Sequence, residues 1–217
     1  MTLQELKKLI QDKYLHHGKT KPCWCKVFNI GGEWDTPSMS RRCMCEHLKT
    51  EHSNKKCEGI ITEQYTLSSG AKSNSYFDIK GLMGDSSDSG ILILELVEYV
   101  DNNISSSIGS LGGTELGGAI LAAMFPYSKN TCFIRKQQRI HGMKKMIEGA
   151  PNSPILLVDD VISSGKTVID AARLCRESGY ELAGALCVIN RYGKDVIPIS
   201  AGYLSVIFSL FKESDFK

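Results

Sequence analysis

The sequence predicts an α/β protein built on a parallel sheet. Apolar runs of strand length alternate with helical patterns from residue 89 onward, and such alternation implies right-handed crossovers and a sheet covered on both faces. The start of the chain differs, because residues 1–60 hold 11 Lys/Arg against 7 Asp/Glu and five of the eight cysteines, whereas residues 61–217 hold 15 against 17. We therefore expect two parts, residues 1–56 and 57–217.

Composition narrows the class of protein. The 217 residues are 42% hydrophobic and 23% charged, which is enough for a sizeable core and argues against disorder. A net charge of only +2 gives no reason to expect nucleic acid or an acidic membrane over the whole surface. The best apolar run, 91–100, is too short to span a bilayer, and the N-terminus lacks the apolar core of a signal peptide. We expect a cytoplasmic protein.

The first part begins with a helical pattern. Thr2 and Glu5 have the spacing of a capping box, and apolar side chains follow at helical intervals to Tyr14, which predicts about four helical turns ending near residues 17–18. Residues 18–45 show no sustained period.

Strands and helices then alternate along the second part. Two short strands, over 60–67 and 75–79, are expected around the turn at 68–70. The remaining predictions are helices over 91–100, 116–124 and 165–178, and strands over 104–108, 131–134, 154–158, 182–189 and 203–210.

The segment 155–167 carries the clearest sign of chemistry. An apolar strand runs into Asp159 and Asp160, then into a turn of small hydroxyl residues and glycine, then into a helix. At the carboxyl end of a parallel strand, such a turn points backbone N–H groups at a ligand phosphate. The acids repel phosphate, but they can accept hydrogen bonds from ribose hydroxyls or sit near Mg²⁺. A ligand with both a phosphate and a ribose would match both the turn and the two acids of this segment.

Two other interpretations of this segment are weaker. Gly165-Lys166-Thr167 suggests a nucleotide-binding P-loop, but Asp160 stands where that motif needs glycine. The structural alternative is a buried strand followed by an ordinary capped helix with solvated acids.

The segment resembles the phosphoribosyl-pyrophosphate (PRPP) signature of type I phosphoribosyltransferases, and further motifs resemble the orotate phosphoribosyltransferases. They lie in the family's order at 65–73 and 76–80 (a base-binding hood), 113–118 (a pyrophosphate loop), 133–142 (a mobile catalytic loop) and 190–191. The resemblance covers residues 57–217. It implies a parallel-sheet, Rossmann-like phosphoribosyltransferase core with a small hood, preceded here by an N-terminal extension.

The resemblance also assigns roles to residues. PRPP binding falls to Thr114, Glu115, Gly117, Asp159, Asp160, Ser163, Ser164, Gly165, Lys166 and Thr167. Catalysis falls to Arg135, Lys136, Arg139, His141, Asp159 and Asp160, and base binding to Tyr76, Phe77, Lys80 and Arg191. The mobile loop is expected to reach the partner's site in a homodimer. From spacing alone, a solvated basic loop, a half-buried strand at 76–77 and surface positions for Lys80 and Arg191 remain open. Lys80 could also serve PRPP instead of the base.

Three positions depart from the family pattern. Ser68 and Gly117 stand where many or some members carry lysine, and Arg139 replaces the loop lysine. Arginine keeps the charge but not the compact geometry of an ammonium group.

Cysteines mark the extension. Cys23, Cys25, Cys43 and Cys45 form two C-x-C pairs, and four thiolates suit tetrahedral Zn²⁺. Reduced free thiols and redox chemistry are the alternatives. Cys132, Cys175 and Cys187 lie in apolar segments and are expected to be small core residues.

We therefore expect a Mg²⁺-dependent phosphoribosyltransferase that acts on orotate and PRPP. The alternatives are transfer to another base, or a PRPP-binding regulatory or adaptor protein whose extension recruits a protein or nucleic acid.

Overall fold

The computed structural model describes residues 2–17, 20–21, 61–62, 65–66, 70, 72–104, 108–126, 130–137, 145–200 and 203–216. Contacts between residues divide the chain into two units, Met1–His16 with Tyr76–Lys217, and His17–Ser75. The first helix therefore belongs to the larger unit, although it precedes the smaller one in sequence. The division into residues 1–56 and 57–217 remains a prediction.

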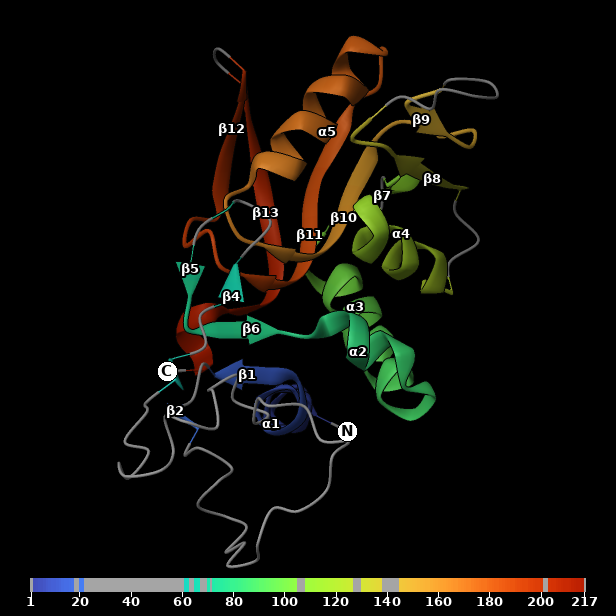
Figure 1. Cartoon of the computed structure of the whole chain (residues 1–217). Coiled ribbons are helices and arrows are strands. Elements are labelled where there is room, and N and C mark those ends of the chain that lie inside the picture. Colours follow the sequence, from blue (N-terminus) through green and yellow to red (C-terminus); the bar gives the residue numbers. More distant parts are fainter. Residues whose placement is uncertain are drawn as a thin grey trace, which may run out of the picture. The chain divides into compact units, whose positions relative to one another are not determined.

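A seven-stranded sheet forms the centre of the larger unit, in the order β12-β13-β11-β10-β7-β8-β9 (Figure 1). Neighbouring strands from β13 to β8 pair in parallel, whereas the edge strands β12 and β9 pair antiparallel. The strands are β7 (Ser110–Thr114), β8 (Asn130–Ile134), β9 (Ile147–Glu148), β10 (Ile155–Ile162), β11 (Leu182–Asn190), β12 (Val196–Ser200) and β13 (Tyr203–Lys212).

Helices cover both faces of this sheet. One apolar cluster joins Leu156 and Val158 of β10 to α1 (Leu3–Leu9), α3 (Ser86–Asn103) and α4 (Glu115–Met124). A second cluster joins Ile155 and Leu157 to α5 (Lys166–Glu177). Alternate residues of a strand point to opposite faces, so β10 is buried on both sides. The predicted α/β class with a mainly parallel sheet is confirmed.

The strand order changes direction between the paired strands β7 and β10, and the region outside the carboxyl ends of these two strands is called the crevice below. From β7 the chain passes through α4 to β8 on one side, and the later strands β10, β11 and β13 are added on the other side. Ligands of open α/β sheets bind at such switch points, outside the carboxyl ends of the strands.

The strand predicted over 104–108 falls largely outside the described residues, which omit 105–107. Helix α3 continues to Asn103, and the next described strand is β7, over Ser110–Thr114. Glycine is required there, because a Cβ at Gly112 would lie 2.8 Å from Ile155 Cγ2 and one at Gly113 would lie 2.6 Å from the Ala119 Cα. The glycine-rich composition that suggests a loop reflects close packing of a central strand.

Other boundaries also differ from the prediction. The first helix is shorter than expected, because α1 passes at Ile10–Tyr14 into a π-helical turn and then into β1 (Leu15–His17). Ile79, expected at the end of a strand, begins α2 (Ile79–Gly84), capped by Asp78. The sequence patterns missed α2, β9, β12 and the final 3-10 helix, Glu213–Phe216.

The smaller unit contains two short antiparallel pairs. β2 (Thr20–Lys21) pairs with β3 (Ile61–Thr62), and β4 (Tyr65–Thr66) pairs with β5 (Lys72–Ser73). Gly70 lies between β4 and β5 with φ of +83°, a conformation that glycine adopts at little cost. The other residues of the turn predicted at 68–70 lie outside the described residues.

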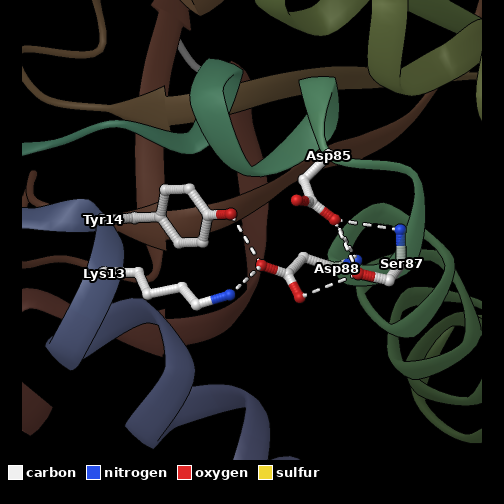
Figure 2. Close-up of polar contacts among 5 residues, drawn as sticks. All are labelled: Lys13, Tyr14, Asp85, Ser87 and Asp88. Atoms are coloured by element: carbon white, nitrogen blue, oxygen red, sulfur yellow. Dashed lines mark hydrogen bonds and ion pairs between the residues drawn. The ribbon is translucent and has the colours of Figure 1, made fainter.

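Polar contacts attach the start of the chain to α3 (Figure 2). The Tyr14 hydroxyl donates to Asp88 Oδ2 at 2.6 Å, and the Lys13 ammonium contacts the same oxygen at 3.0 Å. The backbone N–H of Asp78 donates to the Tyr14 carbonyl at 2.7 Å. Tyr14 thus connects α3 with the beginning of α2. None of the described helices has the length and apolar character needed to cross a membrane.

Candidate active site

Two adjacent carboxylates lie in β10, beside the crevice between β7 and β10. Asp159 and Asp160 are each only 7% exposed. The Asp160 N–H donates to Asp159 Oδ1 and the Val161 N–H donates to Asp160 Oδ1, both at 3.0 Å. These backbone bonds orient both side chains, since each carboxylate has an oxygen that accepts from the following peptide.

The environment of the two acids is electrostatically unequal. Burial, followed by the negative charge of Asp160, raises the pKa of Asp159 well above the ordinary range of an aspartate. Desolvation disfavours the charged form of a carboxyl group, and a like charge nearby adds to this effect. Asp160 instead has a cation beside it.

That cation is Lys80 from α2. Its ammonium forms a short ion pair with Asp160 Oδ2. The Lys80 side chain is 45% exposed and that of Asp160 is 9% exposed, so the ammonium lies at the surface above a buried carboxylate. Burial lowers the pKa of Lys80, but the hydrogen bond and charge of Asp160 raise it more, and the net direction is upward. Lys80 therefore carries its positive charge at neutral pH.

The turn after β7 lies against the same carboxylate. A Cβ at Gly117 would lie 2.5 Å from Asp160 Cγ, and one at Gly118 would lie 2.0 Å from the Val158 carbonyl oxygen. Glycine is therefore needed at both positions for α4 to start this close to β10. Thr114 is buried, and its hydroxyl donates to the Val158 carbonyl at 3.1 Å.

Glu115 adds a strained backbone to this turn. It has φ of +53° and is the non-glycine residue with positive φ in the described part of the chain. Such a conformation costs on the order of 1–3 kcal/mol and is concentrated at functional sites. Nothing in the sequence indicated it.

The turn after β10 leads into α5. Ser163 and Thr167 are half-buried, Ser164 and Lys166 are exposed, and Gly165 has φ of +73° at the helix N-cap. The first N–H groups of a helix lack partners within it, and the helix dipole favours an anion there. This arrangement is suited to a phosphate group. Lys166 forms a surface ion pair with Asp170 at 2.6 Å.

The residues expected at the base lie in a separate cluster. The guanidinium of Arg191 is 5.7 Å from the centre of the Phe77 ring and forms a 2.8 Å ion pair with Glu213. Phe77 is buried, and its ring packs edge-on against Phe216. Tyr76 is half-buried. The packing of Phe77 is that of a core residue, and base binding by this cluster stays a prediction.

The predicted catalytic loop is described only at its start. Arg135 forms a short ion pair with Glu148 of β9, and Lys136 is exposed. Arg139 and His141 lie outside the described residues.

Some of the cysteines are likewise described by the structure and others are not. Cys23, Cys25, Cys43 and Cys45 lie outside the described residues, so the zinc prediction is not tested. Cys132, Cys175 and Cys187 are free and buried, which confirms them as core residues. In the described ranges, no three His, Cys, Asp or Glu side chains gather in a way that could hold a metal ion.

A cavity lies at the amino-terminal ends of the parallel strands β11 and β13, away from the carboxylate pair. It has a volume of about 570 Å³ and is lined by the end of α5, the beginning of β11 and the β12–β13 pair. Its described lining includes none of the residues expected to bind substrate.

Comparison with known proteins identifies the family of the chain. No family model matches the chain. An orotate phosphoribosyltransferase of Pyrococcus abyssi is 34% identical over 131 residues, which cover 58% of this chain and 71% of that protein. The chain belongs to the orotate phosphoribosyltransferase family. The family's enzyme from Aquifex aeolicus is 29% identical over 164 residues, covering 70% of this chain and 85% of that protein.

Solved structures agree with the family assignment. Orotate phosphoribosyltransferase from Aeropyrum pernix matches with a TM-score of 0.59 and 26% identity, covering 70% of this chain and 87% of that one. The Mycobacterium tuberculosis orotate phosphoribosyltransferase, solved with Fe(III) dicitrate, matches with a TM-score of 0.61 over 99% of this chain. At 19% identity the second match supports the fold alone.

The structure brings some of the predicted site residues into contact with one another, and it shows contacts to residues that were not predicted. It brings Lys80 and Gly117 to Asp160, and Phe77 to Arg191. Sequence patterns missed Glu148 and Glu213 as partners of the predicted arginines. The start of α2 could have been predicted from Asp78, because aspartate is a favoured helix N-cap. Its side chain accepts a hydrogen bond from the Gly81 N–H.

Proposed function

We propose that the protein transfers the phosphoribosyl group of Mg²⁺-bound PRPP to orotate, giving orotidine 5′-monophosphate and pyrophosphate. The bond between ribose C1 and the pyrophosphate oxygen breaks, and this oxygen keeps the electron pair. C1 then bonds a ring nitrogen of orotate, which gives up its proton. The observation that carries the proposal is the carboxylate pair beside two helix-starting turns at the β7–β10 crevice, in a chain of this family.

Each part of PRPP has a matching feature in the crevice. Asp159 and Asp160 are proposed to accept hydrogen bonds from the ribose hydroxyls, since carboxylate oxygens accept hydrogen bonds and repel phosphate. The turn at 163–167 offers N–H groups and hydroxyls to the 5′-phosphate. The turn at 114–118 approaches with backbone and glycine, which suits the pyrophosphate. Tyr76, Phe77 and Arg191 are proposed for the base.

Magnesium enters this proposal with the substrate. Mg²⁺ is commonly held by one or two carboxylates together with substrate phosphates and water, and the described residues offer no three-residue metal cluster. The donor set therefore fits an ion that is carried mainly by PRPP. It would neutralise the charge that develops on the leaving pyrophosphate.

We further propose that two copies of the chain form a dimer with shared sites. Helix α4 starts in the crevice and exposes Leu116 and Ile120, at 66% and 36%, and Phe133 of β8 is 37% exposed. Exposed apolar side chains grouped on neighbouring elements favour a protein interface. As the family resemblance implies, the loop at 133–142 of the second copy would then contribute to the first copy's site.

The activity is tested by incubating the protein with PRPP, Mg²⁺ and a panel of bases, and following pyrophosphate release. Release with orotate is the expected result. Release with another base instead would change the substrate, and PRPP binding without release would favour a regulatory or adaptor role for the protein.

The shared site is tested by mixing two inactive variants. One carries Lys136→Ala with Arg139→Ala, and the other Asp159→Asn with Asp160→Asn. A mixed dimer has one site with an intact loop from one chain and intact carboxylates from the other, so activity should return. Subunit exchange, verified by a tagged copy, without recovery of activity would show that each loop serves its own chain.

The cysteine-rich extension is proposed to hold a structural zinc ion through Cys23, Cys25, Cys43 and Cys45. Support comes from the two C-x-C pairs alone. A partner bound by the extension and a cytoplasmic location of the protein likewise stay predictions.

A further inference from the structure

The starting point is the contact between Lys80 and the carboxylate pair. Lys80 is the second residue of α2, and its ammonium pairs with Asp160 Oδ2. The Val161 N–H binds the other oxygen of this carboxylate. Asp160 is thus held from both sides, by backbone on one oxygen and by Lys80 on the other.

The second step concerns what lies next to this ion pair. The carboxylate of Asp160 occupies the space where a side chain at position 117 would begin, since Cβ would lie 2.6 Å from each of its oxygens. Gly117 belongs to the turn proposed to bind pyrophosphate, and it contributes no side chain there. The Asp160 carboxylate packs against Gly117 of this turn. Because Lys80 of α2 pairs with the same carboxylate, its ammonium also lies near the turn.

The third step is charge. A pyrophosphate placed at this turn would meet the negative Asp160 at close range, which is unfavourable unless a cation lies between or beside them. An ammonium group has three N–H donors, and Asp160 Oδ2 uses one in the described structure. Because the Lys80 side chain is 45% exposed, its remaining donors are accessible from the crevice.

From this geometry we propose that Lys80 binds the pyrophosphate group of PRPP and supplies positive charge at a turn where Gly117 supplies none. This inference rests on the proposed function. Of the two roles that the sequence left open for Lys80, the base or PRPP, it selects PRPP and specifies the pyrophosphate group. Phe77 and Arg191 of the predicted base site contact each other, and Arg191 pairs with Glu213, whereas Lys80 contacts Asp160. In the free protein the Lys80 ammonium is held by Asp160. When pyrophosphate is bound, the same ammonium contacts both Asp160 and the pyrophosphate.

The test compares Lys80→Met, Lys80→Arg and a matched control, Lys8→Met. Lys8 is an exposed lysine of α1, so the control removes the same charge away from the crevice. Calorimetry with Mg²⁺ measures the dissociation constants of PRPP, inorganic pyrophosphate and ribose 5-phosphate for each protein, and steady-state kinetics measures kcat and both KM values.

Lys80→Met should weaken binding of PRPP and pyrophosphate about 10- to 100-fold, the range expected for a lost charge-assisted contact. Ribose 5-phosphate, which lacks the pyrophosphate group, should bind within about threefold of wild type, and the KM for orotate should not change. Lys80→Arg should restore part of the pyrophosphate affinity because it restores the charge. Lys8→Met should behave as wild type.

Three results would overturn the assignment. Unchanged pyrophosphate affinity would show that Lys80 does not touch this group. An equal loss for ribose 5-phosphate would mean that Lys80 only orients Asp160, and a rise confined to the KM for orotate would return it to the base. Melting temperatures verify that each variant folds, and Lys80→Gln replaces Lys80→Met if the latter does not. A wild type that binds pyrophosphate but does not use orotate would refute the proposed function while leaving the test of Lys80 intact.

Discussion

Gly118→Ala and Gly90→Ala are the same substitution at two helical glycines, and the structure predicts opposite effects. Gly118 lies in α4, where a Cβ would be 2.0 Å from the Val158 carbonyl oxygen and 3.2 Å from the Asp159 Cα. Gly90 lies in α3, is exposed, and has no atom within 4 Å of an added Cβ. Helix propensity alone would treat them alike, because alanine is favoured over glycine by about 1 kcal/mol in a helix interior.

The magnitudes follow from these two environments. At Gly90 the propensity gain is unopposed, so the free energy of unfolding should rise by about 0.5–1 kcal/mol. At Gly118 the added methyl group collides with the backbone of a buried strand, and overpacking of this kind costs about 1–3 kcal/mol or more. Since the colliding atom belongs to backbone and cannot rotate away, we expect the upper part of that range and a net loss of about 2 kcal/mol.

Thermal denaturation and urea titration measure both changes. For a chain of this size, 1 kcal/mol corresponds to about 2–4 °C in Tm, so Gly118→Ala should melt about 4–8 °C below wild type and Gly90→Ala up to about 4 °C above it. Val158 precedes the carboxylate pair, so Gly118→Ala should also weaken PRPP binding. If Gly118→Ala proved as stable as Gly90→Ala, the close approach of α4 to β10 would be refuted.

Three further predictions concern the carboxylate, the N-terminal contact and the extension. Asp160→Asn should weaken PRPP binding by about 1–3 kcal/mol, the scale of a charge-assisted hydrogen bond, and calorimetry showing equal affinities would contradict its role. The hydrogen bond from Tyr14, with the contact from Lys13, lowers the pKa of Asp88, so its stabilisation is present above the unfolded-state pKa and is lost as pH falls through the folded-state value. The Tm of Tyr14→Phe should therefore lie below wild type at pH 7, and the gap should close toward pH 3; a constant gap would refute this linkage. If Cys23, Cys25, Cys43 and Cys45 hold zinc, the purified protein should contain about one metal ion per chain and a chelator should lower its Tm, whereas four freely titrating thiols would exclude the site.

Local patterns in the sequence were enough to predict the class of fold and the turn between β10 and α5 that is proposed to bind phosphate. The apolar run at 155–158, the two acids after it and the small residues at 163–165 are contiguous, and a strand, a turn and a helix N-terminus each depend on neighbours in the chain. For the same reason the predicted α4, β8 and α5 agree with the structure to within one or two residues.

The strand at 110–114 shows where local reasoning fails. Its glycines are unfavourable in an isolated strand, and only the surrounding Ile155 and Ala119 make small residues necessary. A strand was expected at 104–108, which begins and ends with isoleucine, whereas the described strand that pairs with β10 is Ser110–Thr114. Tertiary contacts decided this boundary.

That Asp159 and Asp160 follow an apolar run and precede a turn suited to phosphate could be predicted from the sequence, because those features are local, although β10 itself continues to Ile162. The position of Lys80 beside Asp160, 80 residues later in the chain, depends on tertiary packing, as does the space that Gly117 leaves for the Asp160 carboxylate. The same holds for Tyr14 and Asp88, which are 74 residues apart. Partners so distant in sequence leave no periodic signal, since their proximity depends on how β7, β10 and the helices pack.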